Sequence, residues 1–175
     1  RRTWAFRGYL SSVSSYRGEL PLQARLFPGD ELVRGFRTGE LGPYALVKTA
    51  PAGGTSSFRV ESPGADLVGA VNGEYRVPAT PRTEAAAFFD LGSGWLLPGW
   101  LGPSRPALLG RTNGALHGST GIEMRWRVPG LEQPLRIYYA FNPLRPRHNL
   151  HLPDGSRFRV PDRRAALRWA FVSLF

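Results

Sequence analysis

The chain has 175 residues, a formal net charge of +10 and no cysteine. This length allows one domain with a sizeable core. The absence of cysteine excludes disulfide bonds and thiolate metal sites, and the lack of an apolar run of about eighteen residues excludes a transmembrane helix.

Arginine supplies almost all of the positive charge, because Lys48 is the only lysine. Arginines can contact the phosphates of a nucleic acid, but they can also line a polar interior or face anionic lipid. Their positions along the predicted strands decide between these interpretations. The first residues, Arg1 to Trp4, contain neither a methionine nor the apolar core of a signal peptide, so we expect a mature chain or a fragment.

The first predicted strand covers Thr3 to Ser12 and leads into a long connection at residues 17–66. The segment from Glu19 to Tyr44 combines apolar residues, several glycines and the turn Pro28-Gly29-Asp30. It has the periodicity of neither a helix nor a strand. A long connection with its own apolar residues is typical of a packed, functional loop.

Five further segments alternate between apolar and polar residues with a period of two, which indicates half-exposed strands. They run from Leu67 to Pro78, Thr83 to Trp95, Leu116 to Val128, Pro134 to Asn142 and Arg164 to Phe175. The charged residues keep to one face of each segment, and the large apolar residues lie mostly on the other. About ten residues is also the length of a tilted strand that crosses a bilayer.

The connections between these segments alternate in length, which favours a membrane barrel over a soluble sandwich. Residues 79–82 and 129–133 are short turns, whereas 96–115 and 143–163 are long. Short periplasmic turns and long extracellular loops are typical of outer-membrane barrels. We therefore predict an all-β, antiparallel transmembrane β-barrel, with Ile137 facing lipid and Arg136 facing the lumen. A soluble sandwich remains the alternative, since it would show the same alternation.

A motif in the long connection resembles a known family. The residues are Val33, Arg34, Gly35 and Phe36, preceded by an R-x-F-x-G pattern at Arg25, Phe27 and Gly29. They are similar to the V-R-G-F/Y loop of the BamA/TamA family of outer-membrane β-barrel assembly factors. The resemblance implies that residues 1–175 are the C-terminal six strands of a sixteen-stranded barrel. Residues 17–66 would be its inward-folded extracellular loop, and 67–175 its last five strands.

The same resemblance implies two lumenal partners for Arg34. Glu74, in N-G-E-Y-R-V-P, is similar to the inward glutamate of the strand after the loop. Asp90, in F-F-D-L-G, is similar to the inward aspartate of the next strand, although it follows the second phenylalanine one residue earlier than is commonest in the family. Strand parity independently places both carboxylates on the charged face. The alternative is that each one pairs with a strand arginine such as Arg76.

The end of the chain resembles the C-terminal β-signal of outer-membrane barrels. The residues that carry this resemblance are Leu167, Trp169, Phe171 and Phe175. The family usually has glycine where this chain has Val172. A last amphipathic strand is the simpler interpretation, and it is compatible with the signal.

No pattern in the sequence indicates catalysis. His148 and His151 lie in a proline-rich stretch without a nearby carboxylate pair, which is a weak basis for a metal site. Gly92-x-Gly94 lacks the following helix of a nucleotide-binding loop. We therefore predict no enzyme activity, no metal and no cofactor.

The resemblance implies an assembly and insertion factor of the bacterial outer membrane. In that family the seam between the first and last strands opens, and a client strand pairs with the exposed edge. The expected partners are client β-barrel proteins, the lipid bilayer with its lipopolysaccharide, and accessory assembly subunits, but no nucleic acid. One alternative is a two-partner-type secretion pore of the same superfamily. Another is a soluble basic all-β binding module.

Overall fold

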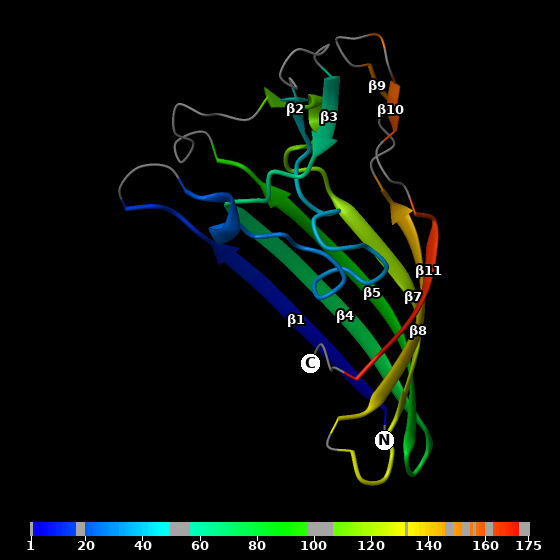
Figure 1. Ribbon diagram of the computed structural model, residues 1–175. Helices are drawn as coiled ribbons and strands as arrows, with labels where there is room; N and C mark the ends of the chain where they lie inside the picture. The colour runs from blue at the N-terminus through cyan, green and yellow to red at the C-terminus, as the bar shows by residue number, and fades with distance from the viewer. Residues whose placement is uncertain are drawn as a thin grey trace.

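The computed structural model describes residues 2–16, 20–49, 57–97, 107–131, 133–145, 149–151, 155, 157–159 and 163–171. Six strands form one curved antiparallel sheet (Figure 1). In spatial order they are β1 (Thr3–Ser12), β4 (Leu67–Thr80), β5 (Thr83–Trp95), β7 (His117–Trp126), β8 (Leu135–Leu144) and β11 (Ala165–Ala170). The sheet is open, with β1 and β11 at its edges. The predicted all-β fold is confirmed, as a part of a barrel that these six strands do not close.

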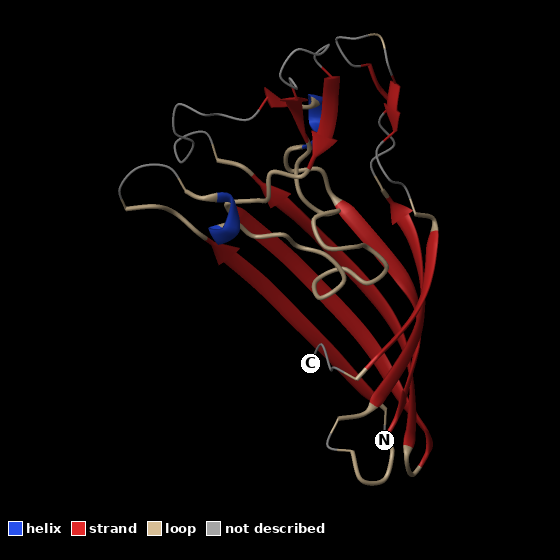
Figure 2. Ribbon diagram, in the orientation of Figure 1, coloured by secondary structure: helices blue, strands red, loops and turns tan. Residues whose placement is uncertain are grey.

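Short strands that the sequence did not reveal lie in the long connections, all beyond the same end of the sheet (Figure 2). They form a three-stranded sheet and a separate hairpin. Their bounds are β2 (Ala45–Thr49), β3 (Ser57–Glu61), β6 (Ala107–Leu108), β9 (Asn149–His151) and β10 (Arg157–Arg159), with 3-10 turns at Leu22–Ala24 and Gly110–Thr112. Within the described parts of the chain, no helix has the length and apolar character needed to cross a membrane.

The two faces of the large sheet have opposite polarity. On the outer face, large apolar side chains are exposed, among them Phe6 (77%), Leu167 (72%) and Ile122 (67%). On the inner face, charged side chains such as Glu74 (1%) and Arg136 (4%) are buried. A soluble sandwich would bury its apolar face against a second sheet, whereas the large sheet of this chain leaves that face exposed.

The long connection covers the inner face. Residues 20–44 leave the end of β1 and lie in front of the sheet before the chain turns to β2 (Figure 1). Their apolar residues pack on the sheet in one buried cluster, which consists of Leu32, Val33, Phe36, Leu41, Ala65, Val68 and Ala70. The backbone also takes part, because the Gly94 N–H donates a 3.0 Å hydrogen bond to the Leu41 carbonyl. The core of the structure therefore lies between the sheet and this connection.

Small residues on the inner face allow this close approach. A Cβ atom added to Gly92 would lie 2.7 Å from Cγ2 of Val33. A Cβ atom on Gly94 would lie 3.3 Å from the carbonyl oxygen of Leu41. Separations this short are tighter than van der Waals contact, so the glycines of β5 leave the space that the connection fills.

Candidate functional site

Residues 29–36 form a compact turn that presents the motif to the sheet. The Gly29 carbonyl accepts hydrogen bonds from the N–H groups of Leu32 and Val33, at 3.0 and 2.9 Å. Gly35 has a φ of +90°, a conformation that side chains rarely adopt. The backbone therefore folds back on itself, and we call residues 29–36 the motif turn.

Arg34 is fully buried and binds Asp90 of β5 in a bidentate manner. Its Nε donates to Oδ2 of Asp90 at 2.7 Å, and one terminal nitrogen donates to Oδ1 at 2.7 Å. The backbone N–H of Arg34 also donates to Oδ2, at 3.1 Å. Two parallel charge-assisted bonds fix both the position and the plane of the guanidinium.

The other terminal nitrogen of Arg34 binds two more carboxylates. It lies 2.6 Å from Glu74 of β4 and 2.9 Å from Glu123 of β7. The structure thus brings Arg34 together with both carboxylates that the sequence analysis assigned to it, and it adds a third. Glu123 was missed, although it lies on the charged face of its strand by the same parity that pointed to Glu74.

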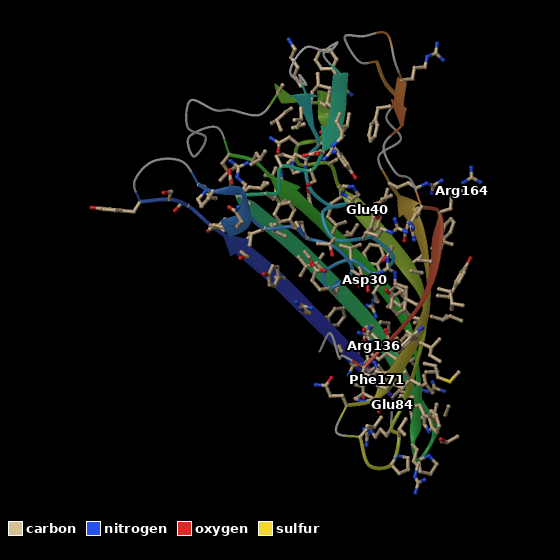
Figure 3. The ribbon with its side chains drawn as sticks, viewed as in Figure 1. Asp30, Glu40, Glu84, Arg136, Arg164 and Phe171 are labelled. Carbon is tan, nitrogen blue, oxygen red and sulfur yellow. The ribbon has the colours of Figure 1, made fainter. Side chains whose placement is uncertain are left out.

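Arginines on the inner face complete a network around these carboxylates. Glu74 accepts hydrogen bonds from Arg76 at 2.8 Å and from Arg125 at 2.7 Å. Glu123 accepts from Arg125 and, at 2.8 Å, from Nε of Arg136. The alternative pairing of Glu74 with Arg76 therefore coexists with its bond to Arg34. Figure 3 shows Arg136 among the side chains on this part of the sheet.

The network keeps Arg34 charged. Burial alone lowers the pKa of a guanidinium, because removal from water disfavours the charged form. The hydrogen bond and charge of Asp90, with the charges of Glu74 and Glu123, outweigh burial and raise the pKa of Arg34 above its ordinary value. Cζ of Arg34 also lies 3.7 Å from the centroid of the Phe88 ring, a cation–π contact. The motif turn is therefore held by a charge that persists at any working pH.

The other motif residues fill the space around Arg34. Val33 is fully buried over Gly92. Gly35 lies so close to β8 that an added Cβ would be 2.8 Å from Oδ1 of Asn142. Phe36 packs edge-on against His117, with ring centroids 5.2 Å apart and an angle of 84° between the rings. All four residues of the motif thus contact or face the inner wall.

Polar residues outside the predicted set also hold the motif turn. Asp30 accepts a 2.8 Å hydrogen bond from the Gly35 N–H and another from the Tyr138 hydroxyl. Asn72 donates to the Leu32 carbonyl at 2.7 Å and to Asp90 at 2.9 Å. The one signal for Asp30 in the sequence is its place in the turn Pro28-Gly29-Asp30. Figure 3 shows it in front of the sheet.

The terminal strand β11 carries its large side chains outward. Leu167 and Trp169 are 72% and 70% exposed, and Phe171 is 45% exposed. The rings of Trp169 and Phe171 lie edge to face, with centroids 6.0 Å apart. Val172 and Phe175, which belong to the predicted β-signal, lie outside the described residues.

The described residues offer no group of three or more histidine, aspartate or glutamate side chains arranged to hold a metal ion. His151 lies in β9, and His148 lies outside the described residues. The carboxylates of the inner face are instead engaged by arginines. The ionic network therefore attaches the motif turn to the inner face of the sheet.

Comparison with known proteins agrees with this geometry. The Omp85 superfamily domain matches residues 5–160, which is most of the chain. A search of curated proteins finds no significant match. The matched region includes most of β1, the motif turn and the strands that carry all three carboxylate partners of Arg34. The chain therefore belongs to the Omp85 superfamily, which includes the BamA/TamA-type barrels that its motif resembles.

Proposed function

We propose that this chain is part of an insertion factor that folds client β-barrel proteins into the bacterial outer membrane. Superfamily membership supports a role in outer-membrane insertion or secretion in general. The observation that carries the finer proposal is the docked motif turn, with Arg34 buried among three carboxylates from three strands. A loop fixed in this way braces the wall from inside without covering the terminal strand β11.

The terminal strand β11 provides the site at which a client strand could pair. Among the described residues, the β11–β8 ladder runs from Ala165 to Ala170, and the β4–β5 ladder runs from Leu67 to Thr80. An edge strand presents backbone N–H and C=O groups that an incoming strand can pair with. Because β11 lies at the edge of the sheet, it gives a client strand a place to add by β-augmentation. The proposed function involves no bond-making chemistry.

The outer face supports a membrane location. Its exposed apolar side chains form a continuous face along the strands, as in an outward-facing lipid band. We propose that lipid covers this face and that further strands close the barrel. The partners proposed are client barrels, lipid with lipopolysaccharide, and accessory assembly subunits.

A depletion experiment separates this proposal from a two-partner-type secretion pore. Cells depleted of the full-length protein are complemented with the wild type, with Arg34→Ala, or with Arg59→Ala as a control at an exposed arginine of β3. We expect Arg34→Ala to lower the level of many outer-membrane barrels, while Arg59→Ala restores them. Loss of one secreted protein with normal levels of other barrels would instead identify a secretion pore. Reconstituted wild-type protein should also accelerate the folding of a denatured client barrel in liposomes.

A further inference from the structure

We propose that Asp30 is a positioning residue that couples the motif turn to the terminal strand β11 through Arg168. Three groups converge on one carboxylate oxygen. Oδ1 of Asp30 accepts the Gly35 N–H at 2.8 Å and the Tyr138 hydroxyl, and it lies 3.8 Å from Nε of Arg168. The inference rests on the proposed function, because it concerns the strand at which a client would add.

Strand register explains why Arg168 reaches this carboxylate. Arg168 stands opposite Tyr138 in the β8–β11 ladder, so both side chains lie on the inner face. Tyr138 is 2% exposed and is fixed by Phe88, whose ring lies edge to face with it at 6.1 Å. Phe88 in turn supports the guanidinium of Arg34, 3.7 Å away. Asp30 thus joins the buried network of the motif to the last strand.

Two contacts tie the motif turn to the end of the chain, and one of them lies before β11: the Asn142 side-chain amide donates to the Gly35 carbonyl at 3.5 Å and to the Arg163 carbonyl at 3.1 Å. The large side chains of β11, at Leu167 and Trp169, face outward and do not reach the loop. Among the described residues of β11, Arg168 is the one that forms an ion pair with the motif turn. Of these two contacts, the one that reaches β11 itself is the ion pair at the Asp30 carboxylate.

The contact works in both directions. Linkage requires that, if docking of the turn favours pairing of β11 with β8, pairing of β11 favours docking to the same extent. The side chains of Arg168 and Asp30 are 32% and 33% exposed, so solvent weakens the pair. An exposed or half-exposed ion pair changes an equilibrium by about two- to fivefold. A bias of this size still allows β11 to separate from β8. Separation would then make docking of the motif turn less favourable by the same factor.

Hydrogen exchange of the full-length protein in lipid nanodiscs tests this coupling. Asp30→Asn keeps an oxygen for Gly35 and Tyr138 but removes the charge that faces Arg168. We expect it to speed exchange of the β11 amides by about two- to fivefold. Arg168→Gln should speed exchange of the amides of residues 29–36 by a similar factor, although Arg168 lies in β11 and not in the motif turn. The double variant should exchange no faster than the faster single variant, because both changes remove the same contact.

Two controls keep the test decisive. Arg164→Gln removes an exposed arginine just before β11 and should change neither segment. Tyr138→Phe removes the hydroxyl that donates to Asp30 and should speed exchange in the motif turn. Effects confined to the substituted segment, or additive effects in the double variant, would overturn the coupling. Failure of the wild-type protein to fold a client in liposomes would count against the proposed function alone, since exchange measures the coupling without a client.

Discussion

Arg34 and Asp90 form a bidentate ion pair from which water is excluded, with two nitrogen–oxygen distances of 2.7 Å and no exposed surface on either side chain. One partner comes from a loop and the other from the middle of a strand, 56 residues later. Desolvation of two charges costs several kcal/mol per ion, and good geometry with added hydrogen bonds must offset it. Glu74, Glu123 and Asn72 supply those bonds.

Replacement of Arg34 by alanine should destabilise the protein strongly. It would leave three buried carboxylates without their shared cation, a change that costs about 3–5 kcal/mol at a dry site. Arg34→Lys should lose less, because it keeps the charge but not the planar fork. Denaturant unfolding of the full-length protein in detergent measures both. Arg59→Ala, at a side chain that is 75% exposed, should stay close to wild type; an equal loss there would contradict a specific role for Arg34.

Gly92→Ala should displace the motif turn from the wall. The new Cβ would lie 2.7 Å from Cγ2 of Val33, a β-branched side chain with little freedom to move. Overpacking of this kind costs about 1–3 kcal/mol. Limited trypsin digestion should then cut faster at Arg37, which is exposed next to the turn.

The control for the Gly92 prediction is Gly8→Ala. A Cβ at Gly8 would have no atom within 4 Å, so the rate of cleavage should not change. Val33→Ala should partly relieve Gly92→Ala in the double variant. Equal cleavage of the two glycine variants would mean that the contact does not hold the turn.

A charged side chain introduced on the outer face should destabilise the protein more when the substituted site lies deeper in the membrane. Ile137 of β8 is 44% exposed among apolar neighbours, and Ile137→Arg should cost about 2–4 kcal/mol if the site lies near the bilayer midplane. Leu131 lies in the short turn before β8 and is 52% exposed, so Leu131→Arg should cost little. Unfolding in lipid vesicles compares the two. Equal tolerance at both sites would contradict a lipid-facing wall.

Tyr44 should make stability depend on alkaline pH. Burial, with the charge of Glu40, raises the pKa of Tyr44 to about 12, from an ordinary value near 10. The folded state therefore holds this proton more tightly than the unfolded state does. The stabilisation is complete below about pH 10 and is lost as the pH rises towards 12, up to about 2–3 kcal/mol. Tyr44→Phe should flatten this part of the profile in denaturant titrations, and an unchanged slope would argue against a buried Tyr44 hydroxyl.

Much of the wall could be predicted from the sequence, because period-two alternation is a local property of each strand. The segments expected at 67–78 and 83–95 match β4 and β5 closely. The short strands were missed because their pairing is not a local property of the chain. β6 has two residues and pairs with β2, some sixty positions earlier, so its partner exists only once the fold has formed.

The site was predicted in part. The resemblance and the strand parity pointed to Glu74 and Asp90, and the structure places both on Arg34. Strand parity alone could not select Glu123, because parity places many residues on the inner face. It does not indicate how far along the strands the loop extends. Asp30 and Tyr138 meet across 108 positions, and no local pattern carries that information.

The three carboxylates around Arg34 come from β4, β5 and β7, all of which follow the motif in the chain. Arg34 thus emerges before any of its partners and finds them only when three successive strands have paired. A slip of one residue in any of these strands would turn its carboxylate towards the opposite face. The complete ion cluster can therefore form only when all three strands pair in the correct register. Burial of Arg34 is thus stable only after this part of the barrel wall has been assembled correctly.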